Sequence, residues 1–287
     1  MSGRRNLMIA GGVQIAPIDG ETGVWLKQGA TVVSSAMRMT GATVISGQSQ
    51  YVYSRGIADM NTIESAGIQY VSSAGKASNC VISSGGSQIL YPEGLAVGDT
   101  ITSATVFISG GTLASSLIGV SGFVRPGKDS FVDSITLSGY HARLYAYGGT
   151  VTNVDMQIGF FYMFSDRSIF ASSIVVGSAT QQFGVSAGYA TDITAYALVR
   201  TYDFGIIDSV TAMQGGKLQV SGGTMANAII SSGGTMTVSS GGVASQTTVL
   251  SGGIMYVSSG ASALAVTSNF GATITVQEGG YIEYVTP

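Results

Sequence analysis

GGTMTVSSGGVASQTTVLS, residues Gly233 to Ser251, is followed directly by GGIMYVSSGASALAVTSNF, residues Gly252 to Phe270. The two stretches align without a gap, so the sequence repeats here with a period of 19 residues. Three further units of the same length run end to end at 47–65, 66–84 and 85–103. A fixed period of this size is typical of a solenoid, in which each repeat forms one coil and stacks on its neighbours.

Within each unit, apolar and polar residues alternate in short runs that are separated by glycine pairs. Alternation indicates β-strands, because successive strand residues point to opposite faces. It predicts that Met236 and Val238 point inward. Gln50, Gln69 and Gln88 fall in one inward column, so we expect their amides to form a ladder along the axis, as amides do in other stacked sheets.

The predicted fold is all-β, a right-handed parallel β-helix of about fourteen coils that lie about 4.8 Å apart. Residues 1–28 match the repeat poorly and contain Trp25, so we predict an N-terminal cap there and the β-helix over 29–287. Between 121 and 214 the period drifts and aromatic residues accumulate. We interpret these irregular, aromatic-rich coils as part of the same solenoid, with bulges or short insertions.

Composition excludes several classes of function. Charged residues make up 9% of the chain, the net charge is −3 and no Lys/Arg cluster is present, which argues against nucleic acid as a partner. No apolar run is long enough to span a membrane in this segment. The first residues lack the apolar region of an export signal, so we expect that signal to lie outside this sequence.

Few residues could carry catalysis. His141 is the only histidine and lies in a strand-like run, and Cys80 occupies an inward column, so we interpret both as structural. No spacing of His or Cys suits a metal, and neither a metal nor a cofactor is expected. Acids do gather in the central coils, where two or three could converge as in a glycosidase or lyase. They are Asp129, Asp133, Asp155, Asp166, Asp192, Asp203 and Asp208.

One outward position of the unit carries aromatic side chains in several coils, and these form the candidate binding strip. Its members are Tyr51, Tyr70, Phe107, Tyr145 and Tyr256, with Ile89 in the same column. Aromatic residues have a high strand propensity and stack on their neighbours, which would account for the strip without a function. The alternative is a flat surface that grips sugar rings or another molecule.

Strings such as AGIQYVSSAGKASNCVISSGG and GGTMTVSSGGVASQTTVLSGG resemble the repeats of AIDA-type self-associating autotransporter adhesins. In these repeats GG, Q or M, V, SSGG, A, T and V recur at about the same spacing. The match covers 47–118 and 215–280. The resemblance implies a β-helical passenger displayed at the Gram-negative outer membrane or secreted. It also implies O-linked heptose on serines of the turns, for which Ser73, Ser84, Ser240 and Ser259 occupy matching places.

We therefore expect a surface-displayed adhesin that mediates cell adhesion, aggregation or biofilm formation through the faces of its β-helix. The expected partners are a second copy of the chain, or glycans on host or bacterial surfaces. The alternative is a carbohydrate-active β-helix enzyme of the polysaccharide lyase or glycosidase kind, which would use the acids of the central coils.

Overall fold

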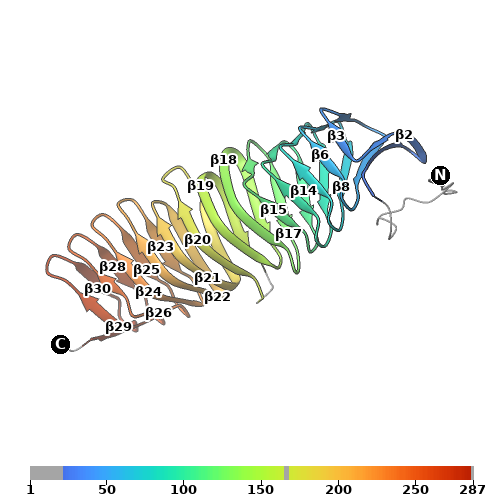
Figure 1. Cartoon of the computed structure of the whole chain (residues 1–287). Coiled ribbons are helices and arrows are strands. Elements are labelled where there is room, and N and C mark those ends of the chain that lie inside the picture. Colours follow the sequence, from blue (N-terminus) through green and yellow to red (C-terminus); the bar gives the residue numbers. More distant parts are fainter. Residues whose placement is uncertain (1–21, 165–167, 286–287) are drawn as a thin grey trace.

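A computed structural model describes residues 22–164 and 168–285. These residues form a β-solenoid of about 13 turns without any helix, in agreement with the predicted parallel β-helix of about fourteen coils. The coils stack into an elongated rod, with the N-terminal strands at one end and the C-terminal strands at the other (Figure 1). Most of the predicted cap, residues 1–21, lies outside the described residues.

Each regular coil contains three short strands, and each strand pairs in parallel with its equivalents in the coils on either side. The strands thus build three faces, which we name after their first members. The β3 face begins with β3 (Arg38–Thr40), β6 (Ile57–Asp59), β9 (Lys76–Ser78), β12 (Leu95–Val97) and β15 (Thr112–Ala114). The β4 face begins with β4 (Thr43–Val44), β7 (Thr62–Ile63), β10 (Val81–Ser83), β13 (Thr100–Thr102) and β16 (Leu117–Ile118). The β5 face begins with β5 (Gln48–Val52), β8 (Ile68–Val71), β11 (Ser87–Leu90), β14 (Thr105–Ile108) and β17 (Phe123–Pro126).

In the central coils the strands of neighbouring faces merge into longer ones. These are β18 (Phe131–Ala146), β19 (Thr150–Met163), β20 (Phe170–Val176), β21 (Gln182–Ala195) and β22 (Leu198–Ala212). Parallel pairing connects them to β17 on one side and to β23 on the other. The register shifts between Leu137 and Ser138 and again before Arg143, where β18 pairs with β19. These irregularities explain the drifting sequence period without a separate fold.

The C-terminal coils return to regular spacing. Their strands are β23 (Lys217–Val220), β24 (Thr224–Ile230), β25 (Thr235–Val238), β26 (Val243–Ser245), β27 (Thr248–Val249), β28 (Ile254–Val257), β29 (Ser262–Ser268), β30 (Thr273–Val276) and β31 (Tyr281–Tyr284). Of these, β23, β25, β28 and β30 continue the β5 face. Met236 and Val238 are fully buried, as the alternation predicts.

Antiparallel strands are found at the N-terminal end of the rod. β1 (Val24–Gln28) lies between β2 (Thr31–Ala36) and β5 and is antiparallel to both. This pairing occupies the edge that β5 would otherwise present to solvent, and exposed edges favour unwanted strand addition. The antiparallel arrangement continues past residue 28, the predicted end of the cap, to Ala36.

The glycine pairs in the turns follow from steric limits. Gly85 has a φ of 83°, a left-handed conformation that glycine adopts without strain. A Cβ on the next residue, Gly86, would lie 2.2 Å from the carbonyl oxygen of Ile63 in the preceding coil. The first glycine of the pair is thus needed for the backbone angle, and the second for the close approach of neighbouring coils.

Candidate functional site

The predicted aromatic strip lies in one column on the outside of the β5 face. Tyr51 pairs with Tyr70, Tyr70 with Ile89, and Ile89 with Phe107. The next residue in the column is Arg125, which pairs with Phe107. The strip is therefore interrupted by a cation, a feature that the sequence prediction missed.

The other two predicted members occupy later coils of the same face. Tyr145 pairs with Tyr162 of β19, an aromatic residue that the predicted strip did not include. Tyr256 pairs with Thr237 on one side and Thr275 on the other, so no aromatic residue adjoins it in the column. The five predicted residues thus belong to one face but form no single continuous surface.

At the N-terminal end, the rings stack along the rod. The Tyr51 ring lies parallel to the Tyr70 ring with centroids 4.9 Å apart, and Tyr70 stacks in turn on Tyr91 at 6.4 Å. Tyr70 is therefore only 6% exposed, although it points outward. Burial raises the pKa of its phenol. Phe107 remains 38% exposed and Tyr256 44% exposed.

Strand β1 contributes to this N-terminal cluster. The Trp25 ring packs edge-on against Tyr53, with centroids 5.7 Å apart. The Lys27 ammonium lies 5.2 Å from the centroid of the Trp25 ring and 4.7 Å from that of Tyr51. A cation at this distance over an aromatic face is attracted by the ring quadrupole. These contacts attach β1 to the first coils.

A second and larger group of rings covers the β5 face in the central coils. Tyr145 packs edge-on against Phe123, Tyr162 and Phe164, with centroid distances of 5.4, 5.6 and 5.2 Å. Tyr147 stacks on Phe164 at 5.1 Å. We call this group, together with Phe160, the central ring cluster. It spans three consecutive coils, where the drift of the period hid the alignment from sequence analysis.

Polar side chains border the central ring cluster. The Arg125 guanidinium lies 4.4 Å from the centroid of the Tyr147 ring. In a later coil, Gln182 Nε2 donates a hydrogen bond of 2.8 Å to the Tyr202 hydroxyl, and Arg200 donates to Gln219 Oε1. Gly184 lies in the same strand as Gln182, and a Cβ at this position would meet the Tyr162 ring at 2.6 Å. The glycine therefore leaves room for the Tyr162 ring to lie across the next coil.

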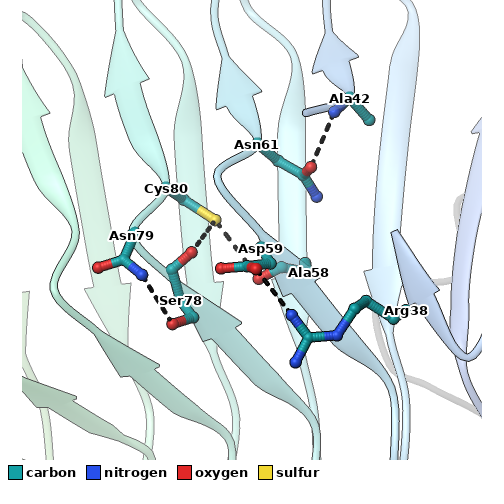
Figure 2. A network of polar contacts seen from close by, with 8 residues as sticks. All are labelled: Arg38, Ala42, Ala58, Asp59, Asn61, Ser78, Asn79 and Cys80. Atoms are coloured by element: carbon teal, nitrogen blue, oxygen red, sulfur yellow. Dashed lines mark hydrogen bonds and ion pairs between the residues drawn. The ribbon is translucent and has the colours of Figure 1, made fainter. Parts of the chain in front are cut away.

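The interior of the first coils holds a ladder of amides, as the sequence predicts. Gln69 Nε2 donates to Gln50 Oε1 at 2.6 Å, and Gln88 Nε2 donates to Gln69 Oε1 at 2.7 Å. Asn61 links this ladder to the backbone, because its Oδ1 accepts a hydrogen bond of 2.8 Å from Ala42 N (Figure 2). Buried polar groups are tolerated when they are hydrogen-bonded, and the side chains of Gln50 and Gln69 meet that condition, whereas Gln88 Oε1 is buried without a hydrogen-bond partner among the described residues.

The ladder ends at a buried carboxyl group. Asp99 Oδ2 accepts a 2.7 Å hydrogen bond from Gln88 Nε2, and Asp99 Oδ1 accepts one of 2.8 Å from Cys80 N. Burial raises the pKa of Asp99 to about 6, against the effect of these two hydrogen bonds. Burial and the nearby Asp99 raise the pKa of Cys80 to about 12, so its thiol is protonated at neutral pH. Cys80 is a buried structural residue, as predicted.

The acids of the central coils do not converge on one point. Asp133 accepts hydrogen bonds from Thr152 and Asn153, which lower its pKa. Asp208 accepts hydrogen bonds from Asn227 and Tyr189, which lower its pKa as well. A general acid in glycoside hydrolysis needs a raised pKa instead. The remaining predicted acids are Asp129, Asp155, Asp192 and Asp203, all exposed, and Asp166 lies outside the described residues. Asp155 and Asp192 line one surface hollow, whereas Asp129 and Asp203 lie in other coils.

The four predicted glycosylation serines lie in exposed turns. Ser73, Ser240 and Ser259 follow strands of the β5 face, whereas Ser84 follows β10 of the β4 face. They therefore occupy two different edges of the rod. Ser73 Oγ donates a hydrogen bond of 2.5 Å to Glu93 Oε2 of the next coil.

The described residues offer neither a metal cluster nor a membrane-spanning helix. Across 22–164 and 168–285, no group of three or more His, Cys, Asp or Glu side chains is placed to hold a metal ion. Over the same residues, we find no helix with the length and hydropathy needed to cross a bilayer. The single histidine, His141, is exposed.

Fold and site together define the class of the protein: a β-helical rod that carries most of its outward ring clusters on the β5 face and has acids spread over several coils. Residues 211–272 match the model of the family described as adhesin of bacterial autotransporter system, probable stalk. Among solved structures, the chain is similar to the crystal structure of a TibC-catalysed hyper-glycosylated fragment of TibA. The TM-score is 0.66 with 29% identity, over 86% of this chain and 84% of that chain. No curated protein matches the chain.

These findings confirm the resemblance that the repeats predict, and support an autotransporter adhesin passenger of the AIDA type. The family implies display at the cell surface. Both comparisons suggest an adhesin without enzymatic activity.

Proposed function

We propose that the chain is a surface-displayed adhesin that mediates cell adhesion, aggregation and biofilm formation by associating with copies of itself. The observation that supports this role most is the column of outward side chains on the β5 face. Phe107 and Tyr256 are well exposed there, and Tyr51 is partly exposed. Aromatic rings provide large contact areas at interfaces, and Tyr adds a hydroxyl group for hydrogen bonding.

The length of the rod makes weak contacts effective. The exposed rings of Phe107 and Tyr256 and the partly exposed ring of Tyr51 lie in separate coils of one face, so two rods that lie side by side can form several contacts at once, and their contributions add through avidity. The low charge content of 9% also limits the repulsion between copies. Surface glycans are the second proposed class of partner.

The exposed turn serines Ser73, Ser84, Ser240 and Ser259 are our proposed O-glycosylation positions. Support comes from their exposure and from the similarity to a hyper-glycosylated fragment of TibA. We expect heptose additions to appear in intact-mass spectra when the chain is made together with a heptosyltransferase. Replacing the four serines with alanine should reduce the added mass; an unchanged mass would assign the modification to other residues.

The proposed adhesin role is tested by displaying the chain on bacteria that do not aggregate, and recording how fast the culture settles. The variant Tyr51→Ser/Phe107→Ser/Tyr256→Ser removes rings from the β5 face and leaves the buried Tyr70 in place. The matched control, Phe131→Ser/Phe170→Ser/Ile206→Ser, removes exposed apolar side chains from the β3 face. We expect settling to be lost in the first variant and kept in the second. Equal settling of both would contradict a role for the β5 face.

A further inference from the structure

Charges are segregated between the faces of the rod. Among the described residues, the strands of the β5 face from β5 to β30 contain no Asp or Glu. These strand segments are β5, β8, β11, β14, β17, 143–146, 160–163, 182–185, 198–201, β23, β25, β28 and β30. They do contain cations, namely Arg125, Arg143, Arg200 and Lys217. All four lie in the central coils or directly beside them.

Acidic side chains occupy the other faces and the turns instead. Asp59, Asp133 and Asp208 lie on the β3 face, and Asp155 lies on the β4 face. In a protein with a net charge of −3, the β5 face is thus a local region of positive charge. Such a region attracts anions, and does so most strongly at low ionic strength.

The cations lie next to the central ring cluster. Arg125 covers the Tyr147 ring at 4.4 Å, and Arg200 lies 5.6 Å from the centroid of the Tyr202 ring. Tyr147 is 36% exposed, and Arg125 and Arg143 are exposed beside it. Rings and the exposed guanidinium groups of Arg125 and Arg143 are therefore available on the same surface. Arg200 adds its charge, but its guanidinium already donates hydrogen bonds to Gln219 and Tyr202. The Gln182 amide likewise already donates one to Tyr202.

This combination matches the chemistry of a charged sugar polymer. Aromatic faces pack against the apolar faces of sugar rings, amides and phenols hydrogen-bond hydroxyl groups, and guanidinium groups pair with carboxylates in a fork geometry. The cluster and its flanking cations extend over several coils spaced about 4.8 Å apart, which gives an extended surface suited to a chain ligand. A compact small molecule would require a concave site instead.

We infer that the central part of the β5 face, from Phe123 to Lys217, binds an anionic polysaccharide such as a uronate polymer. This inference rests on the proposed adhesin function, because it names one class of glycan that such a surface would take. It involves different coils from the self-association contacts at Tyr51, Phe107 and Tyr256, so the two can fail separately.

The experiment uses the purified chain and two immobilised polymers, the uronate polymer polygalacturonate and the neutral polymer dextran. We expect binding to polygalacturonate that weakens between about 0.05 M and about 0.5 M NaCl, because salt screens exposed charges. We expect no comparable binding to dextran. Equal binding to both polymers, or binding to neither, would overturn the inference.

Variants locate the contact. Arg125→Gln/Arg143→Gln removes two exposed cations of the β5 face and should weaken binding to polygalacturonate about tenfold or more, because two charge-assisted contacts are lost. The matched control, Arg55→Gln/Lys76→Gln, removes the same charge from a turn and from the β3 face, and should change the affinity less than about twofold. Each variant is first checked for an unchanged thermal unfolding midpoint. If the arginine variant unfolds, Tyr147→Ser replaces it and should also weaken binding.

Two results would assign the surface differently. Equal weakening by both double variants would reduce the effect to overall charge and overturn the inference. Retention of the chain by its own immobilised copies, lost in Arg125→Gln/Arg143→Gln while polygalacturonate binding persists, would assign the arginines to a protein partner and overturn the inference as well. Normal cell settling in any of these cases would leave the proposed self-association intact.

Discussion

At the scale of single residues, Asp99 has the most unusual environment in the described chain. It is fully buried at the end of the amide ladder, and hydrogen bonds from Gln88 and Cys80 only partly offset the loss of hydration. The unfolded chain would release this proton near the ordinary value of 3.8, whereas the folded chain holds it up to about 6. Because the folded state binds the proton more tightly, deprotonation works against folding.

The contribution of Asp99 to stability should therefore be complete below about pH 4 and fall by roughly 3 kcal/mol as the pH rises through about 6. Asp99→Asn removes this pH-dependent contribution to stability, because an amide does not titrate in this range. We expect the unfolding free energy of Asp99→Asn, relative to the parent, to rise by about that amount between pH 4 and pH 7. Urea unfolding at each pH measures it.

Asp208→Asn serves as the control for this pH series. Hydrogen bonds from Asn227 and Tyr189 lower the pKa of Asp208, so its contribution is present above the ordinary Asp value and is lost at lower pH. Its difference from the parent should thus change only below about pH 4. A flat difference for Asp99→Asn over the whole range would show that Asp99 does not retain a proton in the fold.

At the scale of the strand, alternation decides which substitutions the fold tolerates. Val238 of β25 is fully buried and Thr237 beside it is only half-buried on the outer face. Val238→Asp would place a charge in the apolar core and should cost about 3 kcal/mol or more. Thr237→Asp should cost less than about 1 kcal/mol. Thermal unfolding of the two variants compares them, and equal shifts would mean that the strand has the opposite orientation.

Strand orientation could be predicted because the repeat aligns equivalent residues. The ladder of Gln50, Gln69 and Gln88 follows from the period alone, since a shift of 19 residues places each amide beside the next. The burial of Tyr70 could not be predicted in this way. It depends on the rotamers of Tyr51 and Tyr91 in neighbouring coils, and not on the direction in which Tyr70 points.

The central ring cluster escaped sequence analysis for a different reason. The register shifts in β18 change the spacing between equivalent residues, so Tyr162 could not be aligned with Tyr145 by the period. Arg125 could have been found, because it follows Phe107 in a still regular coil. The antiparallel pairing of β1 with β2 and β5 has no counterpart in the repeat and leaves no periodic signal.

At the scale of the whole molecule, the β-helix is a rod whose faces differ in chemistry. The β5 face combines rings with cations, whereas the acids lie on the other faces and in the turns. A solenoid spreads its surface along an axis, so function can be distributed over many coils rather than concentrated in a pocket. Self-association through the rings at Tyr51, Phe107 and Tyr256 involves few ions and should depend little on salt.

Sedimentation velocity of the purified chain across protein concentration tests most directly whether the β5 face associates. We predict concentration-dependent association that is nearly unchanged by NaCl, is lost in Tyr51→Ser/Phe107→Ser/Tyr256→Ser and is kept in Phe131→Ser/Phe170→Ser/Ile206→Ser. Far-UV circular dichroism confirms that each variant is folded. If the folded β5-face variant associates as strongly as the parent, the strip reflects only strand propensity and the central claim is contradicted.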